Sequence, residues 1–219
     1  MDVGVIERTG AELGRRERKK LETRRALFRA AIELFSERGV DATTVEDIAE
    51  AVDVSARTFH RYFASKEDVL FFDAAQRRAR FAAYLDGRPA GEALLDSLRA
   101  AAHDLTDAFL GDPVDDRRRL ALIRSSVTLR AQNLHHTDLL NQVVAEFAAA
   151  RLSIDAHDPL PRLLGACTIA ALRTAREGIL GPAPADPHTE IDRCFDLVAD
   201  LRAATTPSPA RPPTRRTTP

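Results

Sequence analysis

The stretch at residues 42–68 reads ATTVEDIAEAVDVSARTFHRYFASKED and contains three helix starts in close succession. Thr44 and Ser65 are each followed, three positions later, by an aspartate, which is the spacing of a helix capping box. Between them, Ser55 can cap a short helix directly after the tight connection at residues 52–54. Two short helices joined by so few residues are typical of a helix-turn-helix unit.

The second of these short helices has two chemically different faces. At 100° per residue, Phe59 and Phe63 lie together on one face, while Arg57 and Arg61 lie nearly opposite. A short helix that packs by two phenylalanines and presents arginines outward suits insertion into the major groove of DNA. In isolation the same pattern also fits an amphipathic helix with a solvated basic face, so we keep an all-helical interaction or scaffold protein as the alternative.

The ordered motifs T-x-x-D-I-A, V-S-x-x-T-F-H-R-Y-F and S-K-E-D-V-L resemble the DNA-binding domain of the TetR family of bacterial transcriptional regulators, over about residues 18–70. The resemblance implies a homodimeric regulator that binds double-stranded operator DNA and responds to a small-molecule effector. We expect the second short helix to read bases, and the helix start at Thr44 and the side chain of Lys66 to contact phosphates. The expected DNA-contacting residues are Thr44, Ser55, Ala56, Arg57, Thr58, His60, Arg61, Tyr62 and Lys66.

The composition is that of an ordinary globular protein, with 44% hydrophobic and 30% charged residues over 219 positions. A net charge of −1 excludes a generally basic coat, so any affinity for DNA must come from locally placed cations. No apolar run reaches membrane-spanning length, and no hydrophobic secretory segment opens the chain. The two cysteines, Cys167 and Cys194, suggest neither a metal site nor a disulfide framework, and we expect a cytoplasmic protein.

Hydrophobic periodicity and Gly/Pro breaks predict an all-α fold of about nine helices in two domains. We expect a flexible arm at 1–14, a DNA-binding domain at 15–66, an effector-binding and dimerisation domain at 67–204, and a disordered proline-rich tail at 205–219. The basic run that follows the arm favours phosphate or minor-groove contact, although a solvated helix start would look the same. A single helix over 65–85 is expected to link the domains, followed by helices at 91–110, 114–132, 136–153, 159–180 and 188–204.

The last two expected helices are apolar around more than half of their circumference, which exceeds the need of one protomer's core. A two-fold four-helix bundle would bury the surplus, and in the TetR family the C-terminal helices form the dimer. The expected interface residues are Leu164, Cys167, Ala171, Leu172, Ile191, Phe195 and Val198.

The middle helices carry a large apolar interior, which in the TetR family encloses an effector pocket. The same residues would also make a filled core, and the sequence does not separate these alternatives. The low aromatic content favours an aliphatic over a flat polyaromatic effector. The candidate pocket residues are Phe81, Leu94, Leu98, His103, Phe109, Ile123, Val127 and Phe147.

No catalytic motif is present: the chain lacks a G-x-S-x-G elbow, a phosphate-binding glycine loop and an H-E-x-x-H pair. His135 and His136 are adjacent, so on a helix their side chains point about 100° apart, which does not suit a shared metal ion. We therefore expect no enzyme activity, no metal and no cofactor.

Overall fold

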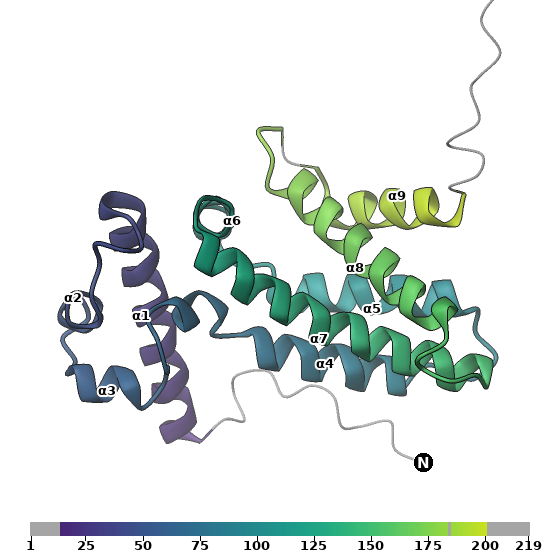
Figure 1. Cartoon of the computed structure of the whole chain (residues 1–219), viewed down its shortest axis with the longest axis horizontal. Coiled ribbons are helices and arrows are strands. Elements are labelled where there is room, and N and C mark those ends of the chain that lie inside the picture. The colour runs from purple at the N-terminus through teal and green to yellow at the C-terminus, as the bar shows by residue number, and fades with distance from the viewer. Residues whose placement is uncertain (1–13, 184, 201–219) are drawn as a thin grey trace, which may run out of the picture.

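The computed structural model describes residues 14–183 and 185–200, and every regular element within these ranges is helical (Figure 1). The predicted all-α fold is confirmed. The elements are α1 (Arg15–Arg38), α2 (Val45–Glu50), α3 (Ala56–His60), the 3-10 helix η1 (Glu67–Phe71), α4 (Ala74–Asp86), α5 (Leu94–Phe109), α6 (Pro113–Ser125), α7 (Val127–Leu152), α8 (Pro159–Ile179) and α9 (Pro187–Ala199). The arm expected at 1–14 is described only at Gly14, and the tail expected at 205–219 lies outside the described residues.

Local hydrogen bonds define α2, α3 and the turn between them. The Thr44 hydroxyl accepts a hydrogen bond from the Asp47 N–H (3.1 Å), and the Asp47 carboxylate accepts one from the Thr44 N–H (2.8 Å), which completes a capping box. Ser55 accepts a hydrogen bond from the Thr58 N–H and begins α3. Between the helices, Asp53 adopts a left-handed φ of 56°, which aspartate tolerates better than most residues. The helix starts at Thr44 and Ser55 thus lie where the sequence predicted them.

Two buried cores hold the chain. The first contains Phe35 and Phe59 from the three N-terminal helices, and it continues through η1 to Leu122, Ile123 and Leu129 of α6 and α7. The second lies among α4, α5, α7, α8 and α9. In Figure 1, α1–α3 gather at one end, α8 and α9 lie toward the other, and α6 stands between them. Helices α7 and α8 cross closely at Gly165, where a Cβ atom would lie 2.6 Å from the Asn141 carbonyl oxygen.

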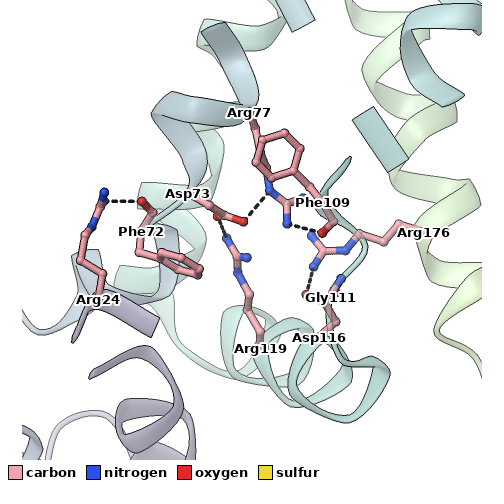
Figure 2. A network of polar contacts seen from close by, with 9 residues as sticks. All are labelled: Arg24, Phe72, Asp73, Arg77, Phe109, Gly111, Asp116, Arg119 and Arg176. Carbon is pink, nitrogen blue, oxygen red and sulfur yellow. Dashed lines mark hydrogen bonds and ion pairs between the residues drawn. The ribbon is translucent and has the colours of Figure 1, made fainter. Parts of the chain in front are cut away.

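The single linking helix expected over 65–85 is wrong, because the structure divides it into η1 and α4 around Asp73. Asp73 has φ −104° and ψ −2°, outside the regular helical range. Its buried carboxylate accepts a hydrogen bond from Arg77 and pairs with Arg119 of α6 (Figure 2). The interruption therefore coincides with a tertiary ionic contact that no local sequence pattern reveals.

The expected break between the helices at 114–132 and 136–153 is also wrong, since α7 runs through it without interruption. The chain breaks at Ser126 instead, where the backbone is extended and α6 ends. The Ser126 hydroxyl then caps α7 by accepting a hydrogen bond from the Leu129 N–H (3.3 Å). Within α7, the Thr137 hydroxyl donates back to the Asn133 carbonyl, and the His136 ring packs at 4.8 Å from the Phe71 ring. The polar residues at this point therefore belong to a continuous helix, where they are half-buried or exposed, rather than to a loop.

Candidate nucleic-acid interface and a cavity beside it

The outer face of α3 is polar and exposed. Phe59 is fully buried and Phe63 nearly so, and they fix the inner face of α3 against the first core. Arg57 and Arg61 are exposed on the opposite side, and His60 is exposed on the flank, where its ring lies 5.5 Å from the Phe59 ring. The division into a phenylalanine face and an arginine face therefore follows the predicted periodicity.

The remaining candidate residues on α3 shape this face. At its start, the Ser55 and Thr58 hydroxyls lie 3.0 Å apart, and Ala56 is half-buried beside them. At its end, Arg61 donates a hydrogen bond to the Tyr62 hydroxyl (3.1 Å) and its guanidinium lies 4.9 Å from the Tyr62 ring centroid. The Tyr62 ring thus holds the arginine in one orientation, which reduces the entropy that an arginine loses on binding.

Two of the expected phosphate contacts are already engaged within the protein. Both the N–H and the hydroxyl of Thr44 donate to the Asp47 carboxylate, and these hydrogen bonds hold the pKa of Asp47 below its usual value. The Lys66 ammonium donates to the carbonyl oxygens of Val40 (2.7 Å) and Thr43 (2.8 Å). Lys66 therefore anchors the loop between α1 and α2, and a phosphate at Thr44 would meet a carboxylate.

The candidate effector residues do not enclose one common space. Phe81 and Leu98 are fully buried in the second core, with Leu94, Phe109 and Phe147 packed against its edge. The other three lie elsewhere. His103 bonds across to Asp192 of α9 (2.9 Å), Ile123 belongs to the first core, and Val127 is 73% exposed. Ile123 and Val127 lie outside the second core, because the break at Ser126 turns this part of the chain toward the N-terminal helices and solvent.

A cavity of about 550 Å³ lies instead where α1 meets α4, the end of α5 and α6, and we call it the junction cavity. Of the expected pocket residues, Phe109 alone lines it. Its walls are formed by Leu21, Arg25, Phe28, Arg29, Phe72, Asp73, Gln76, Arg77, Ala79, Arg80, Ala108, Phe109, Leu110, Gly111, Asp112, Asp115, Asp116 and Arg119.

Buried ion pairs connect the walls of the junction cavity (Figure 2). Asp73 lies 2.7 Å from Arg77 and 3.3 Å from Arg119, while Asp116 lies 2.8 Å from Arg176 of α8. Arg77 also donates to the Phe109 carbonyl (3.0 Å) at the end of α5. This network joins four helices that are distant in sequence, and of its pairs only Asp73–Arg77 has the i,i+4 spacing that sequence reasoning could have found.

Burial acts on the charges of this network in opposite directions. It would raise the pKa of Asp73, but Arg119 and Arg77 outweigh it, so the pKa of Asp73 is lowered overall. Burial lowers the pKa of the Arg119 guanidinium despite Asp73, and it lowers the pKa of Arg176 to about 10. The two arginines thus occupy sites where burial opposes their positive charge.

The expected dimer residues divide by burial. Ala171, Ile191 and Phe195 are buried in the protomer's own second core. Leu172 and Val198 are half-buried against that core, and Leu164 and Cys167 are half-buried on α8. The apolar residues that face outward are different ones: Leu163 is 61% exposed on α8, and Leu197 is 49% exposed on α9. Helical periodicity marked both sides of these helices as apolar but did not indicate which side packs inward.

Two further features complete the description of the site. Within residues 14–183 and 185–200, no three His, Cys, Asp or Glu side chains come together in a geometry that could hold a metal ion. Over the same residues, no helix combines the length and the apolar character needed to cross a bilayer.

Two family models match the chain. Residues 27–71 match the bacterial regulatory proteins of the tetR family, and residues 92–203 match the MftR C-terminal domain. The chain is 38% identical over 159 residues to the HTH-type transcriptional regulator TcmR of Streptomyces glaucescens, covering 69% of this chain and 70% of that protein. It is 26% identical over 181 residues to the mycofactocin biosynthesis transcriptional regulator MftR of Mycobacterium tuberculosis, covering 83% and 91% of the two chains.

Solved structures share the fold. A TetR-family regulator from Syntrophomonas wolfei has a TM-score of 0.63 at 15% identity, over 85% of this chain and 98% of that one. Thermus thermophilus FadR, a repressor solved in complex with lauroyl-CoA, has a TM-score of 0.53 at 22% identity, over 86% and 98%.

A capped helix-turn-helix on a larger helical domain defines a class, the DNA-binding transcriptional regulators. Within that class, the chain belongs to the TetR family of bacterial regulatory proteins.

Proposed function

We propose that the protein is a homodimeric repressor that binds a palindromic operator and is released from it when a small molecule binds. The observation that carries this proposal is the outer face of α3, where Arg57, His60 and Arg61 are exposed above two buried phenylalanines. We further infer a cytoplasmic protein without enzymatic activity, divided into a DNA-binding domain at 15–66 and an effector-binding and dimerisation domain at 67–204.

In the proposed complex, α3 enters the major groove. Arg57, in the first turn of α3, contributes base readout, since arginine pairs with guanine by two hydrogen bonds. Ser55, Ala56, Thr58, His60 and the Arg61–Tyr62 pair contact neighbouring bases or phosphates. The two phosphate roles expected for Thr44 and Lys66 are weakened by their engagement within the protein, and we assign Lys66 to the loop between α1 and α2.

Association of two protomers uses the outward faces of α8 and α9. Leu163 and Leu197 supply exposed apolar surface there, and a two-fold axis would bring each patch against its copy. The two α3 helices would then meet successive major grooves, with half-sites about one helical turn apart.

Release by a small molecule requires that the effector bind the DNA-incompetent arrangement more tightly than the competent one. FadR, which shares the fold, is a repressor whose structure holds lauroyl-CoA. By linkage, operator DNA should weaken effector binding by the same factor, and a coupling of about 1–3 kcal/mol is typical.

The test is fluorescence anisotropy at fixed salt, with DNA from upstream of the protein's own gene and random DNA of equal length. Arg57→Ala should cost about 1–3 kcal/mol on the specific site and relax the preference at one position in each half-site. Arg117→Ala, which removes an exposed arginine from α6, is the matched control and should change neither. Equal affinity of the wild type for specific and random DNA would instead favour the scaffold alternative.

A further inference from the structure

The junction cavity is bounded by both parts of the protein. Phe28 and Arg25 belong to α1, whose other residues support the helix-turn-helix, whereas Arg77 and Arg119 belong to α4 and α6. A molecule in this cavity would therefore touch the DNA-reading part and the effector part at once. In the second core, where the sequence placed the effector, Phe81 and Leu98 are fully buried.

The polar wall of the cavity carries positive charge that is incompletely paired. Arg77 and Arg119, which line the cavity, share the carboxylate of Asp73, whereas Asp116 pairs with Arg176, which does not line it (Figure 2). Arg119 is 5% exposed, and its Nε has no hydrogen-bond partner among the residues that the structure describes. Buried charge is costly when it is incompletely paired, so this wall would gain free energy from an additional anion.

The whole lining repeats this bias, since five arginines and four aspartates face the cavity. Some of the arginines are already paired: Arg80 makes two hydrogen bonds with Asp104, and Arg29 lies 3.6 Å from Asp115. Arg25 is exposed at the α1 side of the cavity. An entering anion can therefore meet Arg25 without first breaking a buried pair.

The other wall is apolar and aromatic. Phe28, Phe72 and Phe109 line the cavity from three different segments. The Arg77 guanidinium lies 5.1 Å from the Phe109 ring centroid, and the Arg119 guanidinium lies 5.7 Å from the Phe28 centroid. Cationic and aromatic groups thus alternate over a few ångströms, which suits a ligand with a charged group attached directly to an apolar body.

We propose that the junction cavity binds an amphipathic small-molecule anion, with its carboxylate, sulfonate or phosphate group at Arg25, Arg77 and Arg119 and its apolar body against Phe28 and Phe109. The proposal deepens the proposed function by assigning the effector a place and a chemical class, and it rests on that function only for the effect on DNA. The bound anion competes with Asp73 for Arg77 and Arg119. Because Arg119 ties α6 to the start of α4 and also lies 5.7 Å from the Phe28 ring centroid of α1, this competition changes the contact of α1 with α6.

The probe is 1-anilinonaphthalene-8-sulfonate, an aromatic sulfonate whose fluorescence rises in apolar surroundings, titrated into the full chain without DNA. Its neutral counterpart, N-phenyl-1-naphthylamine, has the same ring system without the sulfonate. We expect one sulfonate dye per protomer, bound at least about tenfold more tightly than the neutral dye, since a hydrogen bond to a charged group contributes more than the equivalent of that factor.

Two substitutions locate the bound dye. Ala79→Phe fills the cavity from α4 and should abolish saturable binding, while Ala83→Phe, on the same exposed side of α4 but outside the cavity, should leave it unchanged. Arg25→Gln should reduce the affinity of the sulfonate dye about tenfold without changing that of the neutral dye, and Arg117→Gln is its charge-matched control. Arg25 is exposed, so this variant remains informative even where Ala79→Phe disturbs folding.

Equal affinity for the two dyes would overturn the proposed ligand class. Sulfonate binding that survives both Ala79→Phe and Arg25→Gln would overturn the site, and would point to the exposed apolar face of α8 and α9. The dye titration contains no DNA, so its result stands even if the protein does not bind the proposed operator. Conversely, the anisotropy test of operator binding stands even if the dyes do not bind in the cavity.

Discussion

The outer faces of α3 and of the α8–α9 pair both cover a buried core, but their chemistry differs. On α3 the exposed residues are cationic or polar, whereas α8 and α9, which pack on the second core, expose Leu163 and Leu197. Burial beneath each face supplies stability, and the exposed residues determine the partner: a polyanion suits the first, and a second copy of the chain suits the other. The comparison shows that an amphipathic pattern identifies a helix, while the chemistry of its outward residues indicates what it binds.

The largest expected effect is on the inner face of α3. Phe59→Ala would leave a cavity in the first core and lower the free energy of unfolding by about 3–5 kcal/mol. Tyr62→Ala removes a similar ring from the half-buried flank of the same helix and should cost clearly less. Urea unfolding followed by circular dichroism measures both. Equal losses would mean that α3 is not anchored by its phenylalanine face.

The outer face of α8 gives the next largest effect. In the dimer, Leu163→Asp would place one carboxylate from each protomer near the proposed two-fold axis. We expect the dimer to be weakened by about 2–4 kcal/mol, which raises its dissociation constant roughly 30- to 1000-fold. Analytical ultracentrifugation over a concentration series measures that constant. Val127→Asp, at an even more exposed position on α7, should leave it unchanged, and a dimer insensitive to Leu163→Asp would rule out this face as the interface.

A substitution of Lys66 tests whether this cation stabilises the fold or binds DNA. Lys66→Met removes three hydrogen bonds to the α1–α2 loop and should lower the free energy of unfolding by about 1–3 kcal/mol. The slope of log affinity for DNA against log salt concentration should not change, because the ammonium stays bonded to the loop and does not neutralise a phosphate. A slope reduced by about one per site, with stability unaffected, would restore the phosphate role that the sequence suggested.

The smallest effect concerns pH and the turn between α4 and α5. Hydrogen bonds from Arg88 and Ser97 lower the pKa of Glu92 to about 2 from its usual 4.5. The ionised carboxylate is thus favoured in the folded state, so its stabilisation is complete above about pH 4.5 and disappears as the pH falls through 2. Glu92→Gln should be less stable than the wild type at pH 7, and the difference should shrink over that window.

A double-mutant cycle with Arg88→Gln checks the cause of this pH dependence. If Arg88 is the main partner, Glu92→Gln should have little further effect in the Arg88→Gln background. A difference between wild type and Glu92→Gln that is constant from pH 7 to pH 2 would mean that the carboxylate's ionisation is not coupled to folding.

The sequence was most informative where the interactions are local. The caps at Thr44 and Ser55 and the two faces of α3 depend on residues three or four positions apart, and such spacings are visible in the chain. The apolar content of α8 and α9 was equally visible. Yet periodicity does not show whether Phe195 or Leu197 packs inward, because that depends on where α5 lies.

Non-local assembly explains the other errors. Asp73 interrupts the expected linking helix through its pairing with Arg119, a residue distant in sequence. The junction cavity likewise combines Phe28, Phe72 and Phe109 from three separate segments, so a low overall aromatic content did not reveal that rings gather there. Contacts of this kind depend on the packing of α1 against α6, and the spacing of residues within one helix does not predict that packing.

The continuation of the first core into α6 and α7 has a consequence for how such regulators can be recombined. Leu122, Ile123 and Leu129 belong to the C-terminal segment, yet they complete the hydrophobic support of the helix-turn-helix. A chimera that joins residues 15–66 to a foreign effector domain would lose this support unless the donor supplies side chains of matching volume at the three positions. Exchange of operator specificity between relatives therefore requires a transplanted segment that crosses the apparent domain boundary. The end of α6 and the start of α7 must be transferred together with residues 15–66.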